Sequence, residues 1–182
     1  MQILKPVVTA ILISGWLAVP ATAQNANLDA LFEQLVDPTN PDWERVEDEI
    51  WAAWSRSGSD AMDLLLERGR DALAAGNVDA AIEHFTALID HAPDFAEGWN
   101  ARATAYFNAG LYGPSLADIE RTLALNPRHF GALAGLGLIL EELGLKKEAL
   151  EAYQRTKAIH PHRPDVLEAI ERLEKELQGT KL

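Results

Sequence analysis

The hydrophobic and polar positions of this 182-residue chain repeat with a single period from its middle to its C-terminal part. Two series of residues advance in steps of 34: Pro93, Pro127 and Pro161, and Gly76, Gly110 and Gly144. A fixed period in this range is typical of solenoids, in which each unit buries its apolar face against its neighbours. The sequence therefore predicts a stack of repeated units.

Each unit is predicted to contain two helices joined by a tight turn. The glycine suits the end of the first helix, because it adopts the left-handed conformation without steric cost. The proline ends the second helix, since the residue before a proline is pushed out of helical geometry. The pattern predicts first helices over 62–75, 96–109 and 130–143, and second helices over 78–91, 113–126 and 146–160.

The unit resembles the tetratricopeptide repeat. That pattern places small and aromatic residues in the first helix, then alanine, an aromatic residue and proline in the second. The matching residues are Gly69, Ala81, Phe85 and Pro93; Trp99, Ala103, Tyr106, Ile119 and Pro127; and Leu133, Leu136, Gly137, Leu140, Ala149, Tyr153 and Pro161. Arg68, Ala72, Ser115 and Lys157 depart from it. The resemblance covers roughly 62–178 and implies an all-α, right-handed superhelical solenoid of antiparallel helix pairs.

The segment before the repeats has an amphipathic pattern of its own. Trp43, Val46, Ile50 and Trp54 recur at helical spacing on one stripe. These tryptophans are expected to cover the apolar end of the stack, next to the first repeat. Trp51 lies at the edge of the stripe, and an exposed tryptophan can instead anchor a partner.

The first residues have the features of a secretory signal peptide. Lys5 precedes an apolar run, and the residues up to Ala23 end in the small-x-small form that signal peptidase cuts. The apolar run is shorter than the roughly 20 residues that span a bilayer, so cleavage after Ala23 is favoured over an uncleaved anchor. In chain order the predicted parts are a signal peptide (1–23), an N-terminal helical cap or degenerate repeat (24–61), three repeats (62–95, 96–129 and 130–163) and a C-terminal capping helix (164–178).

The composition limits the function classes. The chain has no cysteine and a formal net charge of −12, so disulfides and thiol chemistry are excluded. The negative charge disfavours nucleic acid and anionic membrane surfaces as partners, although it also serves solubility alone.

Motifs of catalysis and of cofactor binding are missing from the sequence. It contains no glycine-rich phosphate loop, nucleophile elbow or HExxH pair. His160 and His162 flank Pro161, but no third metal ligand follows at a recognisable spacing. Four of the five histidines lie at or near the turns between repeats and are expected to be polar turn residues. No enzyme activity, metal or cofactor is predicted.

The expected binding surface is the concave side of the solenoid, formed by the first helix of each unit. Asn100, Thr104 and Asn108 make a polar strip there, and an asparagine amide can bond a peptide backbone as both donor and acceptor. The same strip could serve solubility alone. The predicted partner-binding residues are Leu66, Arg70, Leu73, Asn100, Thr104, Phe107, Asn108, Leu138 and Glu141, with Trp51 as a second candidate contact.

One subclass of the family grips a C-terminal carboxylate with lysine, arginine and asparagine side chains at set positions. The corresponding residues here are Leu66, Arg70, Ala101, Gly131 and Gly135. Only the arginine can donate to a carboxylate, so a carboxylate clamp is not expected.

The chain is most similar to short periplasmic tetratricopeptide proteins of Gram-negative bacteria. This similarity implies a non-catalytic adaptor that binds a protein or peptide partner in cell-envelope assembly or integrity. Two alternatives stay open: a regulatory or assembly subunit of an envelope enzyme complex, and a structural protein that associates with itself.

Overall fold

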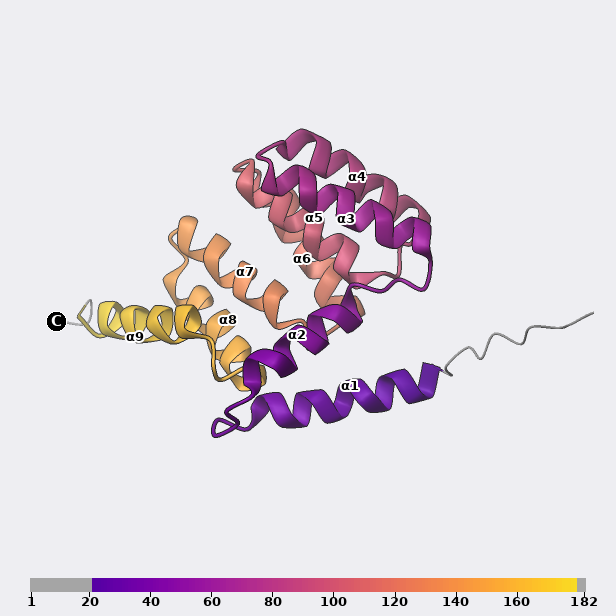
Figure 1. The fold of residues 1–182 in the computed structure, drawn as a ribbon. Coiled ribbons are helices and arrows are strands. Elements are labelled where there is room, and N and C mark those ends of the chain that lie inside the picture. The colour runs from indigo at the N-terminus through magenta and orange to yellow at the C-terminus, as the bar shows by residue number, and fades with distance from the viewer. Residues whose placement is uncertain (1–20, 180–182) are drawn as a thin grey trace, which may run out of the picture.

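The computed structural model describes residues 21–179, in which there are nine helices and no strand. They are α1 (Ala21–Val36), α2 (Trp43–Trp54), α3 (Asp60–Ala74), α4 (Val78–His91), α5 (Ala96–Asn108), α6 (Tyr112–Leu125), α7 (Phe130–Glu142), α8 (Lys146–Ile159) and α9 (Pro164–Gly179). Helices α3 to α8 form three consecutive pairs (Figure 1), and each pair packs on the next. This confirms the all-α solenoid, and the helix ends in the repeats lie within two residues of the predicted ones.

The turn inside each repeat depends on its glycine. Gly76, Gly110 and Gly144 have φ angles of +76°, +71° and +74°. This left-handed conformation lets the following residue return a backbone hydrogen bond to the preceding helix, as Asn77 does to the Ala72 carbonyl at 2.8 Å. The predicted role of these glycines is confirmed.

The two helices of each repeat interlock at one small residue. A Cβ placed on Gly69 would lie 2.2 Å from the Phe85 ring, and one on Gly137 would lie 2.5 Å from the Tyr153 ring. The middle repeat has Ala103 at the equivalent position, opposite the smaller Ile119. Thus glycine is used where the facing residue is an aromatic ring, and alanine where it is not.

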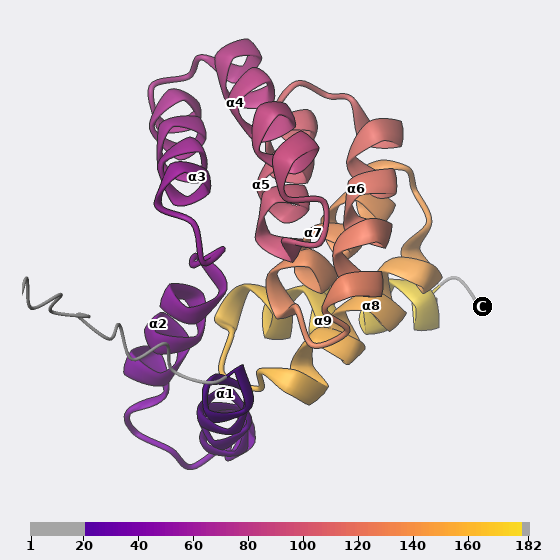
Figure 2. The same cartoon turned by 90° about the vertical axis from the view of Figure 1, so that its right-hand side faces the viewer.

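Helices α1 and α2 form a hairpin that does not lead the stack, contrary to our expectation. It lies along the lower edge of the molecule in both views (Figures 1 and 2), and α1 packs on α8, far along the chain. The core of this N-terminal hairpin includes Phe130 from the start of α7. Its buried residues are Leu31, Phe32, Leu35, Val46, Ile50, Trp54 and Phe130.

The tryptophans of α2 therefore cover the third repeat. The Trp54 ring stacks on the His129 ring, with centroids 4.3 Å apart, and the Trp43 ring stacks on His162 at 5.3 Å. Trp51 fits against Gly131, where a Cβ would come within 2.6 Å of its ring. Of the histidines expected to be polar turn residues, His129 and His160 are instead fully buried.

Polar contacts fix the same interface. The Arg128 guanidinium donates to Asp29 at 2.6 Å, and a ring nitrogen of His162 lies 2.9 Å from the Asp37 carbonyl oxygen. His160 Nε2 lies 3.2 Å from a carboxylate oxygen of Glu47, without the alignment of a hydrogen bond. The close His160 ring, together with the Trp51 indole N–H that donates to Glu47 at 3.2 Å, holds the pKa of the Glu47 carboxyl below its ordinary value.

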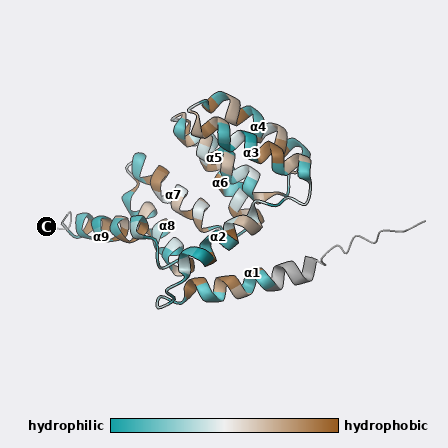
Figure 3. Cartoon of the chain, in the orientation of Figure 1, coloured by the Kyte–Doolittle hydropathy of each residue, from teal (hydrophilic) through white to brown (hydrophobic). Residues whose placement is uncertain are grey.

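Helix α9 closes the other end of the stack against α8. Its ribbon alternates between teal and brown in Figure 3, and its apolar side buries Val166, Ala169, Ile170 and Leu173. None of the helices within residues 21–179 is both long and apolar enough to span a membrane. The predicted signal peptide falls almost wholly outside the described residues, and its cleavage point after Ala23 lies in the first turn of α1.

Candidate functional site

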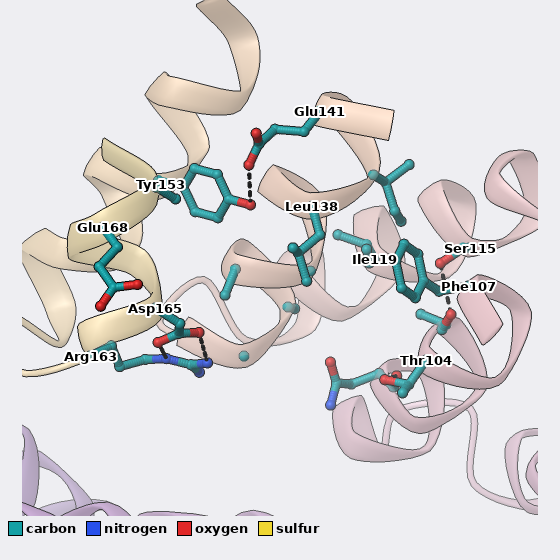
Figure 4. A pocket seen from close by; sticks show the side chains of 18 of the residues that line it. Thr104, Phe107, Ser115, Ile119, Leu138, Glu141, Tyr153, Arg163, Asp165 and Glu168 are labelled. Atoms are coloured by element: carbon teal, nitrogen blue, oxygen red, sulfur yellow. Dashed lines mark hydrogen bonds and ion pairs between the residues drawn. The ribbon is translucent and has the colours of Figure 1, made fainter. Parts of the chain in front are cut away.

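A pocket of about 420 Å³ opens on the concave side of the solenoid. It lies between α5, α7 and α9, and we call it the α5–α7–α9 pocket. Figure 4 shows Phe107 and Thr104 on one side, the Arg163–Asp165 pair and Glu168 on the other, and Leu138 between them. This volume lies within the range of small ligand sites in proteins.

Small residues on α7 make the pocket deep. Ala134 and Gly135 face it where larger residues would fill it. A Cβ on Gly135 would meet only the Ile119 side chain, at 3.7 Å, which is an ordinary contact distance. Beside this hollow, Phe107 is half-buried and Leu138 is 49% exposed. The floor is therefore apolar and accessible.

One wall of the pocket comes from α9. Asp165, Glu168 and Arg172 line it, whereas this helix was expected only to cap the stack. These three positions follow Gly131, Ala134 and Leu138 by one period of 34. Extending the repeat by one more helix would therefore have identified them.

The charged groups of the pocket form two bidentate ion pairs. Arg163 contacts both carboxylate oxygens of Asp165, at 3.1 and 2.6 Å, and Arg172 contacts both oxygens of Glu141, at 2.7 and 3.0 Å. The arginine holds the pKa of each carboxyl below its ordinary value. Glu141 also accepts a hydrogen bond from the Tyr153 hydroxyl at 2.9 Å, and burial together with this carboxylate raises the pKa of Tyr153.

Five of the nine predicted groove residues line this pocket: Asn100, Thr104, Phe107, Leu138 and Glu141. Leu66 does not, because it is 1% exposed and belongs to the core between α3, α4 and α5. Leu73 packs partly against the same core, while Asn108 is exposed at the end of α5. Trp51 is partly buried in the hairpin interface and lies outside the pocket.

Arg70 and Asn100 take part in a network around one buried carboxylate. Glu97 is 3% exposed and accepts hydrogen bonds from Arg70 at 2.6 Å, Asn100 at 3.2 Å and the His129 ring at 2.9 Å. Nδ1 of His129 accepts the Ala132 amide, so the ring is neutral and its Nε2–H donates to Glu97. The single basic side chain at a clamp position thus already has an internal carboxylate partner.

The histidines, aspartates and glutamates in the described part of the chain form no cluster of three or more that could hold a metal ion. His160 and His162, considered above as metal ligands, contact Trp43 of the hairpin with their rings. What the site offers chemically is an apolar socket with hydrogen-bonding and charged walls.

Two segments of the chain, residues 66–114 and 112–164, match the tetratricopeptide repeat family. Together they span more than half of the sequence, and the chain belongs to this family.

Similar proteins fit this assignment. A tetratricopeptide repeat-containing protein of Rhizobium etli is 35% identical over 162 residues, which are 88% of this chain and 79% of that protein. The first such domain of Spaghetti (RPAP3), solved with the HSP90 peptide SRMEEVD, superposes with a TM-score of 0.62 at 24% identity, over 64% of this chain and 93% of that one. The TPR2B domain of yeast Sti1, solved as a complex with pHsp70, gives 0.60 at 16% identity, over 65% and 99%.

Proposed function

We propose that this protein is a non-catalytic adaptor that binds a segment of a partner protein in the α5–α7–α9 pocket. The observation that carries the proposal is the accessible apolar hollow at Gly135, next to the exposed Leu138, on the concave face of the repeats. Concave, largely apolar pockets with a few polar groups on their walls are the usual binding sites of proteins, and this pocket has both features.

Related structures support binding as the mode of action. The Spaghetti domain was solved with an HSP90 peptide and the Sti1 domain as a complex with pHsp70, and this chain has the same fold. The groups that select a partner differ, since the positions that would grip a carboxylate hold Leu66, Ala101, Gly131 and Gly135. We therefore expect this protein to bind a different class of partner from those in the two complexes.

The proposed location is the periplasm, with a role in cell-envelope assembly or integrity. Its support is the signal-like sequence at the N-terminus with a cleavage form ending at Ala23. The absence of cysteine is compatible with an oxidising compartment, because no thiol can be oxidised there. Fractionation of cells that express the intact gene, with the N-terminus of the mature chain sequenced, tests both points.

Gly135→Leu tests the pocket as the binding site. The added side chain fills the hollow without a close contact at Cβ, and replacing a helical glycine stabilises the helix by about 0.5–1 kcal/mol. The variant is therefore expected to keep or raise its Tm and to lose its partner in affinity capture from an envelope extract.

Gly179→Leu is the matched control for that experiment. It makes the same replacement at the end of α9, at an exposed glycine with no atom near its Cβ and outside the pocket. It should capture the same partner as the parent. Equal capture by Gly135→Leu would place binding elsewhere on the molecule, and the proposed site would be wrong.

A further inference from the structure

The free charge of the pocket is negative. Its two arginines, Arg163 and Arg172, are each held by both oxygens of a neighbouring carboxylate. Glu168 also lines the pocket and is exposed, yet it makes no ion pair or side-chain hydrogen bond with any residue in 21–179. Figure 4 places its carboxylate on α9, across the pocket from Phe107. A ligand therefore meets one unpaired carboxylate there and no unpaired cation.

An acidic ligand would have to break contacts that already exist. Bidentate arginine–carboxylate pairs are among the stronger polar contacts in proteins. A carboxylate of the ligand would have to replace the internal carboxylate of such a pair, so the new ion pair would bring little net gain in free energy. At the next part of the groove, Arg70 and Asn100 already donate to the buried Glu97. Removing these donors would leave a carboxylate that is 3% exposed with the His129 ring as its remaining partner, which costs more than a new surface contact returns.

A basic ligand finds an acceptor that is not already paired, while both arginines of the pocket are neutralised by carboxylates. Glu168 is free to pair with it, and the C-terminal end of α7, where Leu138 and Glu141 lie, carries the negative end of the helix dipole. The net charge of −12 on the chain adds a long-range attraction that speeds association.

The apolar floor of the pocket requires that the ligand also carry an apolar side chain. The hollow beside Gly135 has room for a bulky side chain, and Phe107 and Leu138 offer apolar surface in the same pocket. Buried apolar anchors supply most of the binding energy at such interfaces, and surrounding charges supply selectivity.

We propose that the α5–α7–α9 pocket selects a basic, apolar segment of a partner protein. A bulky apolar side chain enters between Phe107 and Leu138, and a lysine or arginine close to it pairs with Glu168. This rests on the proposed function, since it names the chemistry of the segment bound at the same site.

The test is selection of a displayed library of random peptides on the intact protein. The parent should enrich peptides that combine bulky apolar residues with lysine or arginine. Glu168→Lys should shift the enriched charge from basic to acidic, because it reverses the one unpaired charge. Glu174→Lys makes the same change on α9 at an exposed position that does not line the pocket, and it should enrich the same peptides as the parent.

A synthetic copy of the most enriched peptide then measures the contribution of the contact. Glu168→Gln should weaken its binding about two- to fivefold at low salt, the range of a single exposed ion pair, and the difference should shrink as salt is added.

The outcomes separate the two proposals. Enrichment of acidic or uncharged apolar peptides, or the same enrichment on Glu168→Lys as on the parent, overturns the basic-segment proposal and leaves the pocket as a binding site. Enrichment that is equal on the parent and on Gly135→Leu shows that the pocket binds nothing in the library, and both proposals then fail.

Discussion

The three repeats and the N-terminal hairpin are both pairs of antiparallel helices, but they are held in place by different means. Each repeat is stabilised by neighbours in sequence, through interlocks such as Gly69 with Phe85. The hairpin is held by contacts between residues 99 and 125 positions apart, Asp29 with Arg128 and Asp37 with His162. A nearest-neighbour description, which serves for regular repeat arrays, is therefore incomplete for this chain.

The substitution expected to have the largest effect is Trp54→Ala. Removing a buried aromatic side chain costs about 3–5 kcal/mol, and Trp54 packs on Phe32, Phe130 and His129. Hydrogen exchange should show loss of protection in α1 and α2, with α3 and α4 nearly unchanged, because the apolar core of the hairpin includes Phe130 of α7 and no residue of the first repeat.

Trp99→Ala is the control, since this tryptophan lies partly exposed on α5 and contacts Arg102 and Arg121 rather than the hairpin. It should leave protection of the hairpin intact. If Trp54→Ala opened the first repeat as readily as the hairpin, the separation drawn above between the two regions would not hold.

The next largest loss of stability is expected from a substitution within a single repeat. Gly69→Ala forces a methyl group against the Phe85 ring, and overpacking of this kind costs about 1–3 kcal/mol. Denaturant unfolding followed by circular dichroism measures the loss. In contrast, Gly135→Ala should stabilise the protein by about 0.5–1 kcal/mol, because its Cβ has room.

The middle repeat offers the reciprocal experiment. Ile119→Tyr should destabilise the protein, because Ala103 takes up the space that glycine leaves open in the other two repeats. Adding Ala103→Gly should recover part of that loss. A double variant no better than the single one would show that the small residue and the facing ring are not matched in the way proposed here.

The smallest effect depends on pH. The pKa of the Glu47 carboxyl is lowered in the folded protein, chiefly by His160, so its contribution is present above the unfolded pKa of about 4.3 and is lost as the pH falls through the folded value. Protection of the hairpin against hydrogen exchange should therefore fall in acid. Glu47→Gln should reduce this pH dependence, and an unchanged dependence would mean that other carboxyls account for it.

The repeats could be predicted from the sequence because their determinants are local and periodic. Gly76 and Pro93 each mark a helix end, and the partner of every helix is its neighbour. Docking of the hairpin could not be predicted in this way. Trp51 was expected beside the first repeat, and nothing in its local sequence indicates that Gly131, in the third repeat, leaves space for its ring.

Periodicity also predicted part of the candidate site. Asn100, Thr104 and Phe107 follow from the phase of α5, and Leu138 from that of α7. Leu66 of α3 stands one repeat before Asn100 and has the same phase. It is buried, however, because it packs in the core between α3, α4 and α5, away from the pocket. Periodicity indicates which face a residue is on, but only packing shows whether that face is open.

The long-range contacts of the hairpin also bear on the order in which the chain folds. Contacts between residues far apart in sequence form late, since the chain between them must first be brought together. The ribosome makes helices α1 and α2 before the repeats, and Phe130 and His162, on which the hairpin packs, follow about a hundred residues later. The hairpin is thus synthesised before the repeats but is expected to reach its native position after them, and until then its tryptophans are open to chaperones.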